Sequence, residues 1–301
     1  MVRRQQGTVL TEPVTIARAG VLGSPIAHSL SPVLHRAAYR ALGLDHWHYG
    51  AARVEEAGLA AHVAGLDASW RGLSLTMPLK EAAFDVANRV SDLARGTGSV
   101  NTLVRSREGW DADNTDVHGI VRALAGAGLD SVRSAVILGS GATARSAVVA
   151  LTRLGAQRVT LMVRGAARPA TVGQARAAGL RVEEVSMGTW PADVELVIST
   201  APPAATAALA PSLPDGGRVL LDVVYEGGAT SLMTAAHDKG YAVVPGTEML
   251  LHQAGEQVRL MTGEPAPLAA MRTALAAALA DALGDPTPST TASAPRATER
   301  S

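Results

Sequence analysis

The chain has 301 residues, 47% of them hydrophobic, and carries 27 basic and 27 acidic residues. This balance excludes a global field that attracts nucleic acid or an anionic membrane surface, so neither is predicted as a partner. The absence of cysteine excludes disulfides and thiolate metal sites; we predict no metal site and a cytoplasmic protein. No apolar run approaches the ~18 residues of a membrane span.

The N-terminal part predicts a strand over residues 17–22, followed by a loop rich in Gly, Ser and Pro. Ser31 and Pro32 are typical of the N-cap and first residue of a helix, here ending near residue 42. The hydroxyls of Ser29 and Ser31, beside the free amides of a helix start, equally suit a carboxylate ligand. Capping and ligand binding both stay open for Ser31.

The next elements are a strand over 47–52, a helix over 55–65 and an alternating strand that breaks at Pro78. A helix over 79–88 follows, and Lys80 lies in its first turn, where the helix dipole disfavours a cation. A lysine at this position indicates a chemical task, although an exposed solubilising lysine also fits.

Two further polar residues lie on and after a strand predicted over 98–104. Asn101 lies on that strand, and Asp116 begins a helix that runs to residue 127. A helix N-terminus favours a negative charge, which alone explains Asp116, and Asn101 alone is explained as a polar strand end. Neither residue is decisive by itself.

The most informative stretch begins with the apolar residues 135–138, which predict a buried parallel strand. A helix over 145–154 and a strand over 158–163 follow in the order of a dinucleotide-binding βαβ unit. The alternative is a tight strand–helix turn without a ligand. The loop between strand and helix would hold the pyrophosphate at the helix N-terminus, and it consists of Gly139, Ser140, Gly141, Ala142, Thr143 and Ala144.

The end of the second strand of this unit indicates the nucleotide. An NAD site usually carries Asp or Glu there, which accepts a hydrogen bond from the ribose 2′-OH. This chain instead has Arg164 and Arg168, whose guanidinium groups suit a 2′-phosphate. We therefore predict NADP, against the alternative of two solvated surface arginines.

The rest of the chain continues an α/β pattern, in which Thr200 and Ala201 follow a strand at the ligand-binding edge of the sheet. The tail after Gly284 is too poor in large apolar residues to form a core, and residues 285–301 are predicted to be disordered. The predicted elements are helices over 170–179, 231–239, 246–261 and 267–283, and strands over 180–185, 195–200, 218–224 and 241–244.

Six separated motifs resemble, in the same order, those of the shikimate dehydrogenase family over about residues 19–283. They are Gly23-Ser24-Pro25 with His28 to Pro32, Leu75 to Lys80, Val100 to Thr102, Asp113 to Asp116, Leu221 to Tyr225, and Met249 to Gln253.

The resemblance implies an α/β protein of two domains: an N-terminal α/β substrate domain and a Rossmann-type NADP-binding domain, with C-terminal helices that return to the substrate domain. On this basis we divide the chain into residues 1–115, 116–250, 251–284 and the tail 285–301. The implied protein is a monomer or homodimer.

The implied activity is the reversible, NADP-linked interconversion of 3-dehydroshikimate and shikimate, a step of aromatic amino-acid biosynthesis. The resemblance assigns Lys80 and Asp116 as the catalytic pair. Substrate contacts are assigned to the carboxylate-binding Ser29 and Ser31 and to Thr76, Asn101, Tyr225 and Gln253. Cofactor contacts are assigned to Gly139, Ser140, Gly141, Ala142, Thr143, Arg164, Arg168, Thr200, Ala201, Val223, Gly246 and Met249.

The physics of the pair agrees with that assignment. A hydride that reaches a ketone carbon develops negative charge on the oxygen, so a positioned acid must supply a proton, and a base must take it in reverse. A Lys–Asp couple does both, and its two groups titrate as a unit.

Four alternatives stay open. A quinate/shikimate dehydrogenase that prefers NAD is the nearest, and Ser31 and Arg164 argue against it. The others are an aminoshikimate-type dehydrogenase, a methylenetetrahydrofolate-type dehydrogenase and a non-catalytic nucleotide-binding regulator. The last is disfavoured because Lys80 and Asp116 are both present.

Overall fold

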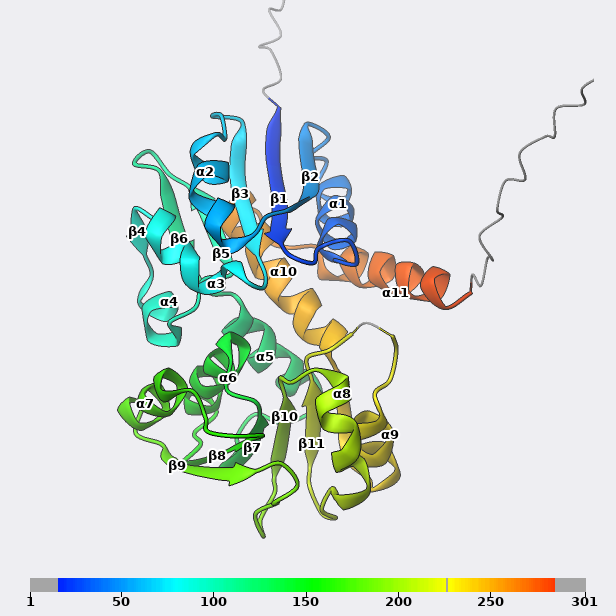
Figure 1. The fold of residues 1–301 in the computed structure, drawn as a ribbon. Helices are drawn as coiled ribbons and strands as arrows, with labels where there is room; N and C mark the ends of the chain where they lie inside the picture. The colour runs from blue at the N-terminus through cyan, green and yellow to red at the C-terminus, as the bar shows by residue number, and fades with distance from the viewer. Residues whose placement is uncertain (1–15, 226, 285–301) are drawn as a thin grey trace, which may run out of the picture.

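The computed structural model describes residues 16–225 and 227–284, which form two six-stranded sheets in separate halves of the molecule (Figure 1). The predicted disordered tail, 285–301, lies outside the described residues. The prediction of a mixed α/β protein with two units is confirmed. In the described part of the chain, no helix has the length and apolar character needed to cross a membrane.

The first sheet has the strand order β2-β1-β3-β5-β6-β4 and combines parallel and antiparallel pairs. Its strands are β1 (Ala17–Gly23), β2 (Trp47–Arg53), β3 (Trp70–Leu75), β4 (Arg89–Val90), β5 (Thr102–Arg105) and β6 (Trp110–Asp113). The helices of this half are α1 (Ser31–Ala41), η1 (Glu56–Gly58), α2 (Leu59–Ala64), α3 (Leu79–Ala82), η2 (Ala83–Val86) and α4 (Asp92–Thr97).

The second sheet is wholly parallel, in the order β12-β11-β10-β7-β8-β9, which is the strand order of a Rossmann fold. Its strands are β7 (Ser134–Leu138), β8 (Arg158–Val163), β9 (Arg181–Ser186), β10 (Leu196–Ser199), β11 (Val219–Asp222) and β12 (Ala242–Pro245). Its helices are α5 (Asp116–Gly126), α6 (Ala142–Arg153), α7 (Pro169–Ala177), α8 (Pro203–Thr206), η3 (Ala207–Ser212) and α9 (Ser231–Asp238).

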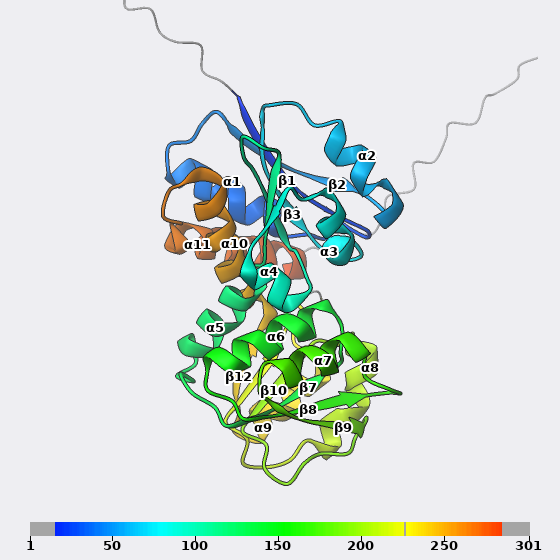
Figure 2. The same ribbon diagram turned by 90° about the vertical axis from the view of Figure 1, so that its left-hand side faces the viewer.

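Two C-terminal helices, α10 (Gly246–Thr262) and α11 (Leu268–Gly284), return to the first sheet, as predicted. Helix α10 contacts α5 and then β3, β5 and α1, while α11 packs on α1 (Figure 2). Apolar side chains of both helices, such as Leu251 and Met271, share one core with Leu34 and Tyr39 of α1. The first sheet is therefore covered on one side by chain from both ends of the sequence.

The structure corrects two local predictions. Ser31 is not the N-cap of α1: Leu30 occupies that position with right-handed helical angles, and no side chain caps the helix. The Ser31 hydroxyl is therefore not used for capping. The helix predicted over 79–88 is only the short α3 followed by the 3₁₀ turn η2.

A polar seam joins the two halves on the α4 side of the molecule. The buried guanidinium of Arg145, on α6, donates to the carbonyl oxygens of Thr97 at 2.8 Å and Gly98 at 2.8 Å. It also forms an ion pair of 2.7 Å with Glu81 of α3. Because these carbonyl groups belong to the end of α4, Arg145 fixes one half of the molecule against the other.

Candidate active site

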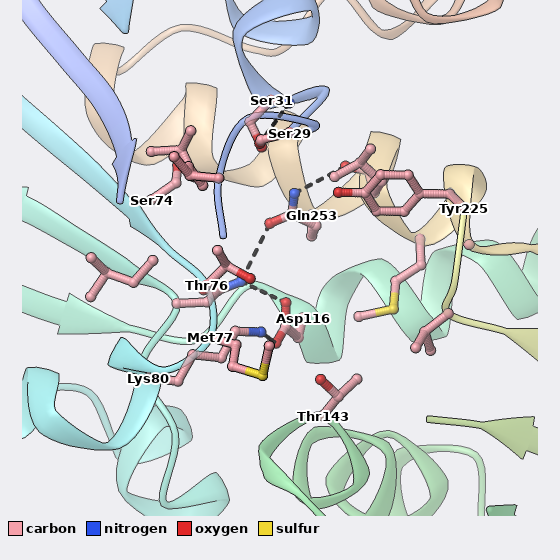
Figure 3. Close-up of a pocket in the computed structure, with 18 of the residues that line it drawn as sticks. Ser29, Ser31, Ser74, Thr76, Met77, Lys80, Asp116, Thr143, Tyr225 and Gln253 are labelled. Atoms are coloured by element: carbon pink, nitrogen blue, oxygen red, sulfur yellow. Dashed lines mark hydrogen bonds and ion pairs between the residues drawn. The ribbon is translucent and has the colours of Figure 1, made fainter. Parts of the chain in front are cut away.

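A cavity of about 370 Å³ lies where the two sheets face each other. Figure 3 shows that polar side chains from both ends of the chain point into it. The structure thus brings together residues that the sequence places more than 200 positions apart. All predicted catalytic and substrate-binding residues line this cavity: Ser29, Ser31, Thr76, Lys80, Asn101, Asp116, Tyr225 and Gln253.

Lys80 and Asp116 form an ion pair at the floor of the cavity, with 2.6 Å between Nζ and Oδ2. The two side chains are 15% and 5% exposed, so water screens the pair far less than it screens a surface pair. Lys80 comes from the short helix α3, and Asp116 is the first residue of α5. The N-terminus of α5 stabilises the carboxylate, which in turn holds the ammonium group inside the cavity.

Asn101 and Asn114 hold Asp116 from its other side. The Asn101 Nδ2 atom donates to Asp116 Oδ1 at 2.7 Å, and the backbone N–H of Asp116 donates to Asn114 Oδ1 at 3.0 Å. Both carboxylate oxygens therefore have a donor, one from Lys80 and one from Asn101. This arrangement fixes the carboxylate plane.

Ser29 and Ser31 lie at the start of α1, across the cavity from the ion pair (Figure 3). The backbone N–H of Ser31 donates a long hydrogen bond of 3.4 Å to Ser29 Oγ. Two hydroxyl groups at a helix start form a site that suits a carboxylate, because the helix dipole also favours negative charge there.

Gln253, on α10, is a further polar residue of the cavity. Its Oε1 atom accepts from Asn101 Nδ2 at 3.3 Å and from Thr115 Oγ1 at 3.4 Å, and its Nε2 atom donates to the Leu250 carbonyl at 3.2 Å. Tyr225 and Thr76 also line the cavity. The cavity therefore offers hydroxyl and amide partners for a small polyhydroxylated acid.

Sequence reasoning missed Ser74 and Gln257, which also line the cavity and are buried. Ser74 lies on β3, and Thr76, two positions further on, directly follows the end of that strand. Gln257 follows Gln253 by four positions, one turn further along α10. These spacings were the available signal.

The glycine loop after β7 has the geometry of a dinucleotide site. Gly139 has φ +106°, and a Cβ there would lie 2.8 Å from Thr200 Oγ1, so a larger residue is excluded. Gly141 precedes α6, whose start no side chain caps, and a Cβ on Gly141 would extend into open space. Free space in front of uncapped N–H groups fits a pyrophosphate.

Arg164 and Arg168 follow β8 in the chain, and both residues are exposed. The Arg168 backbone N–H donates to Ser140 Oγ at 3.1 Å, which ties this segment to the glycine loop. Its side chain lies 3.6 Å from Glu81 of the other half. A 2′-phosphate beside the glycine loop would meet two accessible cationic groups.

The other predicted cofactor residues lie along the same carboxyl edge of the second sheet. Thr200 follows β10 and donates to the Leu138 carbonyl at 2.8 Å, with Ala201 beside it. Val223 follows β11, and a Cβ on Gly246 would lie 2.4 Å from the Val223 carbonyl oxygen, so only glycine fits. The predicted cofactor residues that line the cavity itself are Thr143, Val223, Gly246 and Met249.

Comparison with known proteins identifies the family. The model of the shikimate dehydrogenase substrate binding domain matches residues 21–103, and that of the shikimate 5′-dehydrogenase C-terminal domain matches residues 246–276. A shikimate dehydrogenase (NADP(+)) from Anaeromyxobacter sp. is 37% identical over 282 residues, which cover 86% of this chain and 95% of that protein.

Solved structures agree with this result. The crystal structure of Mycobacterium tuberculosis shikimate dehydrogenase superposes with a TM-score of 0.81 at 43% identity, covering 87% of this chain and 99% of that one. The Thermus thermophilus enzyme, in complex with NADP(H) and shikimate, superposes with a TM-score of 0.78 at 30% identity, covering 87% and 100%. The resemblance inferred from the sequence motifs is confirmed, and the chain belongs to the shikimate dehydrogenase family.

Proposed function

We propose that this chain catalyses the reversible, NADP-dependent reduction of 3-dehydroshikimate to shikimate, with Lys80 and Asp116 as its acid–base pair. The observation that carries the proposal is the partly buried Lys80–Asp116 ion pair. It lies between hydroxyl groups suited to a carboxylate and an uncapped helix start suited to a dinucleotide.

The substrate would be oriented by its two ends. Ser29 and Ser31 would bind the carboxylate, while Thr76, Asn101, Gln253 and the ion pair would bind the ring oxygens. This orientation places the reacting oxygen beside Lys80 and Asp116, where the pair supplies a proton in reduction and takes it back in oxidation. The ammonium group also stabilises the negative charge that develops on that oxygen.

The glycine loop, Arg164 and Arg168 would hold NADP along the carboxyl edge of the second sheet, with Val223, Gly246 and Met249 near the cavity. When bound, the nicotinamide donates or accepts the hydride. The protein contributes position, charge and exclusion of water.

The reaction is tested by following the absorbance of the reduced nicotinamide, with shikimate or quinate offered together with NADP or NAD. We expect turnover mainly with shikimate and NADP. Turnover mainly with quinate and NAD would instead place the protein with quinate dehydrogenases, and no turnover in any of the four mixtures would contradict the proposal.

The cofactor assignment predicts that Arg164→Ala raises the KM for NADP by about tenfold, because a charge-assisted contact with the 2′-phosphate is lost. The KM for NAD, which lacks that phosphate, is expected to stay unchanged. Arg133→Ala is the matched control, because Arg133 is an exposed arginine at the amino edge of the same sheet. Equal KM values for NADP in Arg164→Ala and Arg133→Ala would refute the assignment.

The division of the chain into residues 1–115, 116–250 and 251–284 is part of the proposal, and the two separate sheets support it. We also propose a cytoplasmic enzyme that is a monomer or a homodimer. Light scattering of the purified protein measures its molar mass, and thereby tests the second statement.

A further inference from the structure

The Asn101 carboxamide contacts Asp116 with one end and is held by buried groups at the other. Its Nδ2 atom donates to Asp116 Oδ1 at 2.7 Å. Its Oδ1 atom accepts from the Thr115 backbone N–H at 2.8 Å and from the Thr102 hydroxyl at 2.8 Å. A backbone N–H can only donate, so the Asn101 oxygen must face Thr115 and its NH₂ group must face the carboxylate.

The Thr102 hydroxyl is itself oriented by Gln257. The Gln257 Nε2 atom donates to Thr102 Oγ1 at 3.0 Å and to the Asn101 backbone carbonyl at 3.1 Å. Because a carbonyl oxygen can only accept, the NH₂ group of Gln257 must lie on this side. The Thr102 oxygen thus accepts from Gln257, and its single hydrogen is directed to Asn101.

The opposite end of Gln257 is fixed as well. Its Oε1 atom accepts from the Ser74 hydroxyl at 2.8 Å, and Ser74 Oγ accepts from the Tyr49 hydroxyl at 2.6 Å. His35 Nε2 lies 3.3 Å from the same Oε1 atom. Burial raises the pKa of Tyr49, so that hydroxyl keeps its hydrogen and remains a donor. Every hydrogen bond from Tyr49 to Asp116 therefore points in the same direction.

We propose that Thr102 and Gln257 are positioning residues, which fix the orientation of the Asn101 carboxamide against the Lys80–Asp116 pair. The inference rests on the proposed function, since it concerns the residues of that reaction. Thr102 and Gln257 are 0% and 1% exposed, and a buried polar group that loses its hydrogen bond is costly. A rotated Asn101 amide would turn its oxygen toward the Asp116 carboxylate and repel it.

The role acts on turnover more than on binding. Of the proposed substrate contacts, Asn101 belongs to this chain of hydrogen bonds, whereas Ser29 and Ser31, which would bind the substrate carboxylate, lie at the start of α1 outside it. A loosened Asn101 disturbs the Asp116 carboxylate where the proton is transferred. Small errors of position at a reacting centre lower the rate strongly while the remaining contacts keep the affinity.

The inference is tested with Thr102→Val, which keeps the shape and removes the hydroxyl, and with Gln257→Glu, which replaces the donor by an acceptor. We expect each change to lower kcat by about tenfold and to change the KM for shikimate by less than about threefold. Thr102→Ser restores the hydroxyl and is expected to recover kcat to within about twofold of the wild type.

The matched control is Thr262→Val. Thr262 lies at the end of α10, donates to the Val258 carbonyl at 2.7 Å and accepts from the Glu264 backbone N–H at 3.1 Å. Its loss removes two hydrogen bonds outside the cavity, and kcat is expected to stay unchanged. Suppose that the wild type is active and that Thr102→Val and Gln257→Glu have the same kcat as this control. That result would overturn the inference and leave the proposed function intact. The same holds if only KM changes, or if Thr102→Ser fails to recover kcat. A wild-type protein without turnover would overturn the proposed function and the inference together.

Discussion

Replacing Lys80 by alanine is expected to lower kcat by about three orders of magnitude, while the KM for shikimate changes only a few-fold. General acid–base catalysis by one positioned group contributes about 10²–10⁴ to a rate, and Lys80 also carries the charge that stabilises the developing oxyanion. The variant keeps the other proposed contacts with the carboxylate and the hydroxyl groups of the substrate, so KM changes little. Steady-state kinetics with shikimate and NADP measure both constants, and a normal kcat would remove Lys80 from the mechanism.

Substitution by arginine separates charge from proton transfer. Lys80→Arg keeps a cation beside Asp116, but a guanidinium group does not release its proton near neutral pH. We expect kcat to stay at least about a hundredfold below the wild type. Lysine occurs at only two positions in the sequence, 80 and 239, so Lys239→Arg is the natural control. Lys239 pairs with Asp215 at 3.1 Å beyond α9, outside the cavity, and its variant is expected to keep full activity.

Acid is expected to destabilise the fold through His35, by about 3 kcal/mol between pH 7 and pH 4. Burial lowers the pKa of His35 from 6.5 to about 3, and the hydrogen bond with Gln257 offsets this only partly. Between these two pKa values, His35 is protonated in the unfolded chain and neutral in the folded chain. The free energy of unfolding therefore falls as the pH falls through this window, by about 1.4 kcal/mol per pH unit.

Comparison with His35→Phe isolates this contribution. Phenylalanine preserves a ring that can stack on Tyr49, as His35 does at 3.9 Å between ring centroids, but it binds no proton. Burial also lowers the pKa values of His118 and His252, and their effects cancel because both proteins contain them. Denaturant unfolding at several pH values measures the free energy of unfolding. This free energy is expected to fall less steeply with falling pH in His35→Phe than in the wild type. Parallel curves for the two proteins would contradict the assignment.

The second sheet could be predicted well because its four inner strands, β7, β8, β10 and β11, are almost entirely buried and appear in the sequence as short apolar runs. The βαβ unit at 134–163 has the predicted strand β8 and a helix that begins three residues early, at Ala142. The short elements α4, α8 and η3 were not predicted. Such pieces have few residues in which a period can show, and tertiary contacts such as those of Arg145 with the end of α4 hold them in place.

Within the candidate site, residues at the starts of helices were easier to predict than residues in the middle of a strand or helix. Lys80 lies in the first turn of α3 and Asp116 is the first residue of α5, and a charge at a helix start stands out in a single sequence. Gln257 meets Asn101 across 156 positions, and only the packing of α10 on β3 and β5 brings them together. Ser31 shows the opposite error: Ser-Pro statistics favoured a cap, but Leu30 already has helical angles.

The cover of the first sheet by α10 and α11 dictates an order of events during translation. The apolar sides of β1 and α1 leave the ribosome early, but the helices that bury them begin at residue 246. At about 5–20 residues per second, the chain between α5 and α10 takes on the order of ten seconds to synthesise. During that interval strands β7 to β11 of the second sheet are synthesised, whereas the N-terminal half still exposes the apolar surface that α10 and α11 cover. The N-terminal half therefore completes its hydrophobic core only after the last two helices have been synthesised.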